Sequence, residues 1–411
     1  MPSPTTSSPT KILLLEGVSL NALNSLTKQG FEVEYHKKAL PKDILLQKIP
    51  NFHAIGIRSK TQITREILDA ATNLQTIGCF CIGTNQVDLD AATQKGIVVF
   101  NSPFSNSRSV AELVLGEIIA LSRQLGDRNS ELHNGIWNKV SNNSKEIRGK
   151  TLGIVGYGHI GTQLSVLADA MGMKVNFYDS LSLMPLGTAK PLASLQELLM
   201  QSDYITLHVP ETPETKNMIS EKELSLMKKG SILINASRGS VVDIPALAKF
   251  LKNGHLAGCA VDVYPHEPFA NGPNFHTELQ GCPNTILTPH IGGSTEEAQF
   301  SIGVEVSNAL SKFLTSGCSM GAVNLPEIDL KKPVGKNTVR IVNFHNNVPG
   351  VLKQINKILS DFNIEKQTLD SKGPVSYLMA DLSLEDLREE ELSQLHSDLN
   401  SINENILTRI F

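Results

Sequence analysis

Short apolar runs alternate with amphipathic stretches along the first part of the chain. Residues 11–16 and 54–57 are apolar enough for buried strands, and residues 31–35 alternate between apolar and polar side chains. Residues 74–77 and 96–100 are two further apolar segments. Helical patterns separate these segments, and strands that alternate with helices predict a parallel α/β sheet.

The same alternation begins again after a long apolar helix, which the pattern predicts at residues 109–121. A strand at residues 150–155 opens this second series of strands and helices, which runs to about Gly293. We therefore predict a second α/β domain over residues 106–293.

A helical pattern then continues from Ser294 to about Phe313. A helix of this length can lead the chain back to the first sheet. We therefore predict a discontinuous first domain, made of residues 11–105 and 294–330, into which the second domain is inserted.

The last part of the chain predicts a small domain of a different kind. Residues 331–336 resemble a linker, and residues 337–411 contain two successive βαβ-type patterns, which indicate a ferredoxin-like domain. The expected fold class is thus α/β, with two Rossmann-like, doubly wound parallel-sheet domains and a C-terminal ferredoxin-like domain.

Composition excludes several function classes. A chain of 411 residues is too long for one core, and a net charge of −4 with 5% aromatic residues argues against a nucleic-acid binder. Five cysteines do not make a disulfide framework, and we interpret Cys79 and Cys81 as packing residues rather than metal ligands. Residues 1–10 resemble a disordered tail without signal-peptide features. Without a long apolar run, we expect a soluble, cytoplasmic protein.

One glycine motif indicates a dinucleotide site. Gly156, Gly158 and Gly161 form a G-x-G-x-x-G that follows a predicted strand and opens an apolar helix. The next predicted strand ends at Asp179, where a carboxylate would bind the ribose hydroxyls and repel a 2′-phosphate. The motif therefore favours NAD over NADP. The alternative is that the glycines serve a flavin or a plain bend and that Asp179 starts a turn.

Polar residues that could catalyse one reaction together follow three later predicted strands. Arg238, Glu267 and His290 follow three apolar segments, and ligands of parallel sheets bind at the carboxyl ends of strands. Oxidation of a secondary alcohol by NAD needs a base for the hydroxyl proton, a task that suits His290 with Glu267 to hold its ring. Arg238 suits a substrate carboxylate. Each residue alone has a structural interpretation; together, behind a dinucleotide motif, they indicate catalysis.

The sequence resembles the D-isomer-specific 2-hydroxyacid dehydrogenases at these positions. The glycine motif with Asp179, the Ser237-Arg238-Gly239 turn, the Glu267-Pro268 pair and the segment 289–293 all match signatures of that family. The resemblance implies catalytic roles for Arg238, Glu267 and His290. It implies NAD contacts at Gly156, Gly158, His159, Ile160, Gly161, Asp179, His208, Val209, Pro210, Ala236, Ser237, Arg238, Asp262, His290, Ile291, Gly292 and Gly293.

Within the family, the chain is similar to members that oxidise 3-phospho-D-glycerate to 3-phosphooxypyruvate, the first step of L-serine biosynthesis. Such members can also reduce 2-oxoglutarate to 2-hydroxyglutarate. A phosphorylated substrate needs cations, and Arg58, Ser59 and Lys60 at a predicted strand end fit that need, with Asn106 and Lys139 as further substrate contacts. Trp137 has a structural interpretation as a packing residue of the core or of an interface, and the resemblance implies packing at a dimer contact.

The C-terminal domain resembles an ACT domain, a module that binds amino acids. The resemblance implies L-serine as a feedback inhibitor, recognised by His345, Asn347 and Asn363, and assembly as a homotetramer. An alternative is that the ACT domain serves assembly alone. Two other functions stay open: a D-2-hydroxyacid dehydrogenase whose substrate lacks a phosphate, and a dinucleotide-sensing binding protein on the same fold. We expect no metal ion, no nucleic acid and no membrane among the partners.

Overall fold

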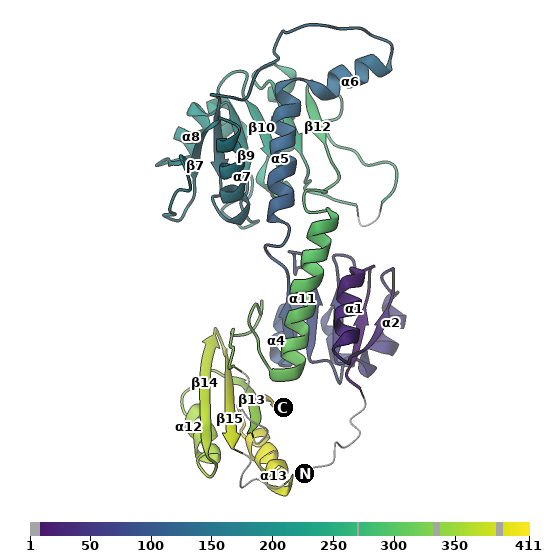
Figure 1. The fold of residues 1–411 in the computed structure, drawn as a ribbon, viewed down its shortest axis with the longest axis vertical. Helices are drawn as coiled ribbons and strands as arrows, with labels where there is room; N and C mark the ends of the chain where they lie inside the picture. Colours follow the sequence, from purple (N-terminus) through teal and green to yellow (C-terminus); the bar gives the residue numbers. More distant parts are fainter. Residues whose placement is uncertain (1–8, 269–270, 332–337, 384–388) are drawn as a thin grey trace. The chain divides into compact units, whose positions relative to one another are not determined.

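The computed structural model describes residues 9–268, 271–331, 338–383 and 389–411 (Figure 1). The chain forms two compact units: the first unit consists of Met1–Pro103 with Gln299–Phe411, and the second unit consists of Phe104–Ala298. Most of the predicted tail, residues 1–10, and of the predicted linker, residues 331–336, lies outside the described residues.

The first unit contains a five-stranded sheet in which every neighbouring pair of strands is parallel. Its order is β2-β1-β3-β4-β5. The strands β3 and β4 are buried at every position, which explains their uninterrupted apolar sequences. The elements are β1 (Lys11–Leu14), α1 (Leu20–Lys28), β2 (Glu32–Tyr35), α2 (Lys42–Lys48), η1 (Ile49–Asn51), β3 (Ala54–Ile57), α3 (Arg65–Ala70), β4 (Thr76–Cys79), α4 (Leu89–Gln94), β5 (Val98–Phe100) and α11 (Glu296–Ser316).

The second unit contains a seven-stranded parallel sheet of order β12-β11-β10-β9-β6-β7-β8. The order reverses between β6 and β9, and such a switch point leaves a crevice at the carboxyl ends of the strands. Its elements are α5 (Ser107–Ser122), α6 (Leu125–His133), β6 (Thr151–Val155), α7 (His159–Ala170), β7 (Lys174–Tyr178), β8 (Lys190–Pro191), α8 (Leu195–Gln201), β9 (Tyr204–Leu207), α9 (Glu221–Leu226), β10 (Ile232–Asn235), η2 (Gly239–Val241), α10 (Ile244–Lys252), β11 (Gly258–Val261) and β12 (Thr285–Leu287). The two predicted parallel sheets are thus confirmed.

The C-terminal residues form a four-stranded antiparallel sheet of order β14-β15-β13-β16 with two helices. Its elements are β13 (Thr338–Asn346), α12 (Val351–Leu359), β14 (Ile364–Lys372), β15 (Val375–Ser383), α13 (Glu389–Asn400) and β16 (Asn405–Ile410). One face of the sheet packs on the helices, where Ile341 joins Ile355 and Leu395 in one core. This βαββαβ order confirms the ferredoxin-like fold.

The other face of this small sheet shares a core with the first unit. Phe344 and Tyr377 belong to the same buried cluster as Phe313 of α11, and the Tyr377 hydroxyl donates to the Gly317 carbonyl at 2.6 Å. The C-terminal residues therefore count with the first unit, whereas the sequence predicts a separate domain. Long-range side-chain packing, which no local pattern records, makes the difference.

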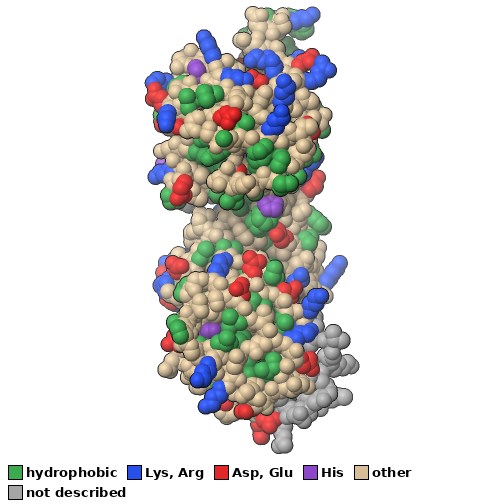
Figure 2. Space-filling model, turned by 90° about the vertical axis from the view of Figure 1, so that its left-hand side faces the viewer, with side chains coloured by type: hydrophobic (Ala, Val, Ile, Leu, Met, Phe, Trp, Pro, Cys, Tyr) green, Lys and Arg blue, Asp and Glu red, His purple; other side chains and the backbone are tan. Residues whose placement is uncertain are grey.

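Two predictions of burial and charge can be compared with the structure. Trp137 is 80% exposed, which excludes the alternative of a core residue and leaves packing at a dimer contact as a prediction. Figure 2 shows acidic and basic side chains interspersed over one face, as the small net charge leads one to expect. Among the described residues, all five cysteines are free thiols, and Cys79 is fully buried as a packing residue. In the same part of the chain, no helix is long and apolar enough to span a bilayer.

Candidate active site

The glycine turn lies between β6 and α7, next to the switch point of the second sheet. Gly156 has φ +90°, and a Cβ there would stand 2.4 Å from the His208 carbonyl oxygen. A Cβ on Gly161 would stand 2.3 Å from the Gly156 carbonyl oxygen, so helix and strand approach too closely for any side chain. Gly158 has nothing within 4 Å of such a Cβ among the described residues. This open space at the amino end of α7 fits a pyrophosphate.

Asp179 follows the end of β7 and fixes the same turn. Its carboxylate accepts the Tyr157 amide at 2.7 Å and the Leu181 amide at 2.9 Å. The carboxylate is thus held beside the glycine turn, at the place where a ribose hydroxyl is bound in dinucleotide folds.

His290 and Glu267 form an ion pair at the carboxyl-end loops of β11 and β12. His290 Nδ1 lies 2.7 Å from Glu267 Oε2, while Glu267 Oε1 accepts the Tyr264 amide at 3.1 Å. The hydrogen bond to Glu267 raises the pKa of His290 above its ordinary value, against the effect of burial. Burial would raise the pKa of Glu267, but hydrogen bonds from His290 and Tyr264 bring it below its ordinary value.

His290 is held in an unusual backbone conformation. Its φ is +54°, in the left-handed region that a histidine rarely occupies. The buried Asp262 carboxylate fixes the surrounding loop, because it accepts the Thr288 hydroxyl at 2.6 Å and the Ile291 and Gly292 amides, each at 2.8 Å. Such strain at a histidine is typical of functional sites.

Arg238 follows β10, and its charge affects the pKa values of both Glu267 and His290. Its positive charge is among the causes that lower the pKa of Glu267, and it works against the raised pKa of His290. Asn235 holds the turn by donating to the Arg238 carbonyl at 3.0 Å and by accepting the Ser237 amide and hydroxyl. The structure therefore brings Arg238, Glu267 and His290 together.

His208 lies at the end of β9, across the switch point from the glycine turn. Burial lowers the pKa of His208 to about 3, so its ring is neutral. Nε2 lies 3.0 Å from the Thr206 hydroxyl, and Nδ1 is buried without a hydrogen-bond partner among the described residues. A neutral ring with a free nitrogen at this edge can bind a cofactor group.

Arg58, Ser59 and Lys60 follow β3 in the first unit. Glu16, a residue that the sequence analysis missed, accepts the Lys60 amide at 2.9 Å and the Thr61 amide at 2.8 Å. In the described part of the chain, the side chains of Arg58 and Lys60 have no ion-pair partner. Two unpaired cations at a strand end can hold a substrate anion.

Asn106 and Lys139 belong to the second unit. Asn106 is the N-cap residue of α5 and lies beside Gly293, because a Cβ on Gly293 would collide with the Asn106 side-chain amide. Lys139 is exposed. The structure thus places Asn106 next to the His290 loop.

The three residues predicted to bind serine differ in exposure. His345 is buried, with Nδ1 2.9 Å from Asn343 Oδ1, and burial lowers its pKa. Asn347 is exposed and donates to the Gly373 carbonyl at 3.3 Å, and Asn363 is exposed. The two amides are therefore accessible from solvent.

Two more residues of the second unit were missed. The ring of Phe104 stacks on the His159 ring at 3.6 Å, beside the glycine turn. Glu117 of α5 is buried with both carboxylate oxygens unpartnered among the described residues. Burial, with the charge of Asp262, raises the pKa of Glu117 to about 8. A glutamate on the apolar face of the predicted helix was the available signal.

No group of three or more potential metal ligands occurs within the described ranges.

The family model described as "D-isomer specific 2-hydroxyacid dehydrogenase, NAD binding domain" matches residues 115–292. The chain is 57% identical over 409 residues to D-3-phosphoglycerate dehydrogenase 2 of Saccharomyces cerevisiae, covering 97% of this chain and 87% of that protein. It is 55% identical to D-3-phosphoglycerate dehydrogenase of Dictyostelium discoideum, covering 99% of each.

A solved structure agrees with these relatives. The NAD-complexed D-isomer specific 2-hydroxyacid dehydrogenase of Lactobacillus delbrueckii ssp. bulgaricus matches with a TM-score of 0.68 and 26% identity, over 77% of this chain and all of that one. Sequence identity over almost the whole length, together with the fold, leaves no other family. The chain belongs to the D-isomer specific 2-hydroxyacid dehydrogenases, which bind NAD.

Proposed function

We propose that the protein oxidises 3-phospho-D-glycerate to 3-phosphooxypyruvate with NAD, the first step of L-serine biosynthesis. The names of relatives that are 57% and 55% identical support this substrate. The observation that carries the proposal is the His290–Glu267 pair beside Arg238, at the carboxyl end of a dinucleotide-binding sheet.

His290 acts as the base in this reaction. Its Nδ1 is bonded to Glu267, so Nε2 is left to accept the proton of the substrate hydroxyl. Glu267 holds the ring in one tautomer and stabilises the imidazolium that forms. Arg238 binds the substrate carboxylate and polarises the neighbouring carbon–oxygen bond.

The residues of the second unit fit NAD, because Gly158 leaves open space at the amino end of α7. When bound, NAD supplies the hydride acceptor. The amides of the glycine turn bind the pyrophosphate, and Asp179 binds the ribose hydroxyls. Asp262 orients the loop that presents His290, since its carboxylate already accepts three hydrogen bonds from that loop.

The substrate phosphate binds to Arg58, Ser59 and Lys60. A phosphate dianion favours two unpaired cations with a hydroxyl. Glu16 orders the backbone of this segment, so that the charges are presented from a fixed turn. Asn106 and Lys139 add polar contacts to the substrate.

L-serine regulates the enzyme through the C-terminal domain. The ferredoxin-like fold and the accessible amides of Asn347 and Asn363 support a site for a small zwitterion, with His345 beneath. The protein assembles as a homotetramer, in which Trp137 packs against another subunit. Its 80% exposure supports such a contact, because a large apolar side chain on the surface is typical of interfaces.

The direct test is the rate of NADH oxidation with 3-phosphooxypyruvate, with and without L-serine. We expect fast turnover that serine slows. Turnover that serine does not slow would contradict regulation by serine and leave the C-terminal domain a role in assembly. Absence of turnover would contradict the proposed substrate.

A variant separates phosphate recognition from general catalysis. Arg58→Ala should raise the KM for 3-phosphooxypyruvate about tenfold or more, the value of one charge-assisted contact, and should change the KM for 2-oxoglutarate little. Equal effects on both substrates would show that Arg58 does not bind the phosphate.

A further inference from the structure

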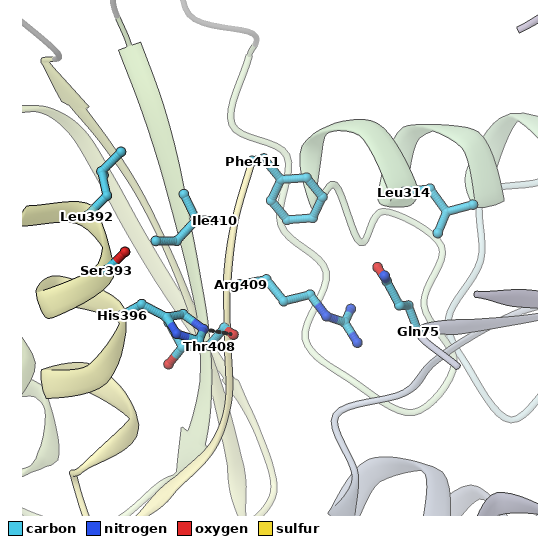
Figure 3. Close-up of a pocket in the computed structure, with 9 residues that line it drawn as sticks. All are labelled: Gln75, Leu314, Leu392, Ser393, His396, Thr408, Arg409, Ile410 and Phe411. Atoms are coloured by element: carbon cyan, nitrogen blue, oxygen red, sulfur yellow. Dashed lines mark hydrogen bonds between the residues drawn. The ribbon is translucent and has the colours of Figure 1, made fainter. Parts of the chain in front are cut away.

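A pocket of about 660 Å³ lies beside the edge strand β16, where the C-terminal domain meets the first sheet (Figure 3). Its wall comes from both parts of the first unit: Gln75 precedes β4, Leu314 belongs to α11, and Arg409 belongs to β16. The remaining lining residues are Leu392, Ser393, His396, Thr408, Ile410 and Phe411.

Arg409 lines this pocket, and its side chain has no polar partner in the described part of the chain. Figure 3 shows its guanidinium extending from β16 toward the Gln75 amide. Among the described residues, Arg409 has no ion pair or hydrogen bond from its side chain, and its Nη1 is fully buried. Its one side-chain contact of note is the Phe313 ring, 5.7 Å from the guanidinium carbon.

A second arginine of the same sheet shows how such a charge is usually satisfied. Arg340 of β13 makes two hydrogen bonds to the Asp381 carboxylate, at 2.6 and 2.8 Å, and donates to the carbonyls of Ser316 and Lys331. Arg409 has none of these acceptors. A buried guanidinium without an acceptor lowers the stability of the fold. An acceptor from outside the chain would remove this penalty.

The charges around Arg409 also favour an anion. Its electrostatic neighbours are the buried Tyr377 hydroxyl and His53, whose pKa the arginine helps to lower after burial. Lys11 also lies near His53, but its ammonium is paired with the Glu32 carboxylate at 3.3 Å, so Arg409 carries the unpaired charge here. No acidic side chain lines the pocket in the described part of the chain. Burial lowers the pKa of Arg409 to about 10, so the guanidinium still carries its charge at neutral pH.

We propose that this pocket binds a small oxyanion, the phosphate or carboxylate group of a metabolite, between Arg409 and Gln75. The guanidinium fork binds two oxygens of such a group, and the Gln75 amide donates to a third. Leu314 and Phe411 supply apolar walls for the rest of the molecule. The bound anion thus connects β16 of the C-terminal domain to the amino end of β4 in the first sheet.

The test is calorimetric titration of the full-length protein with inorganic phosphate and, separately, with malonate. Arg58→Gln is included because phosphate also binds at the substrate site. We expect Arg409→Gln to weaken one phosphate site about tenfold or more, and Arg58→Gln to leave that site intact. Arg65→Gln, which changes an exposed arginine of α3, is the matched control and should leave both sites unchanged. A stronger response to malonate than to phosphate identifies a carboxylate ligand.

A second variant keeps the proposal testable if Arg409→Gln does not fold. Gln75→Glu places a carboxylate opposite the guanidinium, so it should raise the Tm and abolish phosphate binding at this site. Phosphate isotherms unchanged from the wild type in Gln75→Glu would overturn the proposal, as would an unchanged isotherm in a folded Arg409→Gln protein.

Discussion

Glu267→Gln tests whether the charge of Glu267, rather than its shape, activates His290. The amide oxygen of glutamine can still accept the Nδ1 proton that now goes to Glu267 Oε2 at 2.7 Å. The ring therefore keeps its orientation and tautomer, while the negative charge beside it is removed. The amide NH2 then faces the Tyr264 amide and loses the hydrogen bond that Glu267 Oε1 accepts, so the shift of the pH profile, rather than the rate alone, reports the electrostatic part of the pair.

The size of the effect follows from the geometry of the pair. A hydrogen bond that involves a charged group contributes about 1.5–3 kcal/mol. The side chains of His290 and Glu267 are 49% and 36% exposed, so solvent screens the pair and the lower end applies. About 1.5 kcal/mol corresponds to roughly a tenfold loss in kcat, because the imidazolium forms in the transition state.

The pH profile gives the sign of the change. Glu267 raises the pKa of His290, so replacing the Glu267 carboxylate with a neutral amide should lower the pKa of His290. Oxidation requires neutral His290, and its acid limb should move to lower pH in the variant. Reduction requires protonated His290, and its alkaline limb should also move to lower pH. The assay is kcat/KM against pH in both directions.

Glu278→Gln is the matched control, because Glu278 is an exposed glutamate on a neighbouring segment. It should leave both profiles where they are. An unchanged pH limb in Glu267→Gln, or a shift to higher pH, would refute the electrostatic role of the pair, and an unchanged kcat would refute its place in the reaction.

Three further predictions concern the cofactor site and the C-terminal domain. Asp179→Ala should weaken NAD binding and reduce the preference for NAD over NADP in kcat/KM; an unchanged ratio would contradict the ribose assignment. Gly156→Ala should weaken NADH binding in fluorescence titrations by roughly ten- to a hundredfold, because the φ of +90° and the His208 carbonyl force strain of about 1–3 kcal/mol. Asp381→Asn should lower the free energy of unfolding of the C-terminal domain by about 3–5 kcal/mol, since it leaves the buried Arg340 unpaired. Urea unfolding followed by hydrogen exchange in β13 measures this loss, and the double change Arg340→Met with Asp381→Leu should lose less.

Much of the active site is readable from local sequence. The glycine turn and Asp179 lie within one βαβ unit, whose geometry is almost fixed by the residue types. Arg238 and His290 each end an apolar strand, and the carboxyl ends of parallel strands share one edge. Their meeting therefore follows from the pattern once the sheet is predicted.

Residues that act through distant partners could not be predicted. Glu16 accepts the Lys60 amide from 44 residues along the chain, and no local pattern around Glu16 predicts this hydrogen bond. Asp262 is placed by the sequence near a cofactor, yet the structure shows its carboxylate engaged with the loop of His290. The sequence left Trp137 either in the core or at an interface, and its 80% exposure depends on which segments cover it.

The element types, the two parallel sheets and the ferredoxin-like order follow from the local sequence, because hydrophobic periodicity and glycine positions act over a few residues. The core that the C-terminal sheet shares with α11 could be found only from the folded chain, and so could the pairing of Arg340, in contrast to Arg409, which has no polar partner among the described residues. The physical reason is that burial and charge pairing depend on contacts between residues far apart in the chain, which a local pattern does not encode.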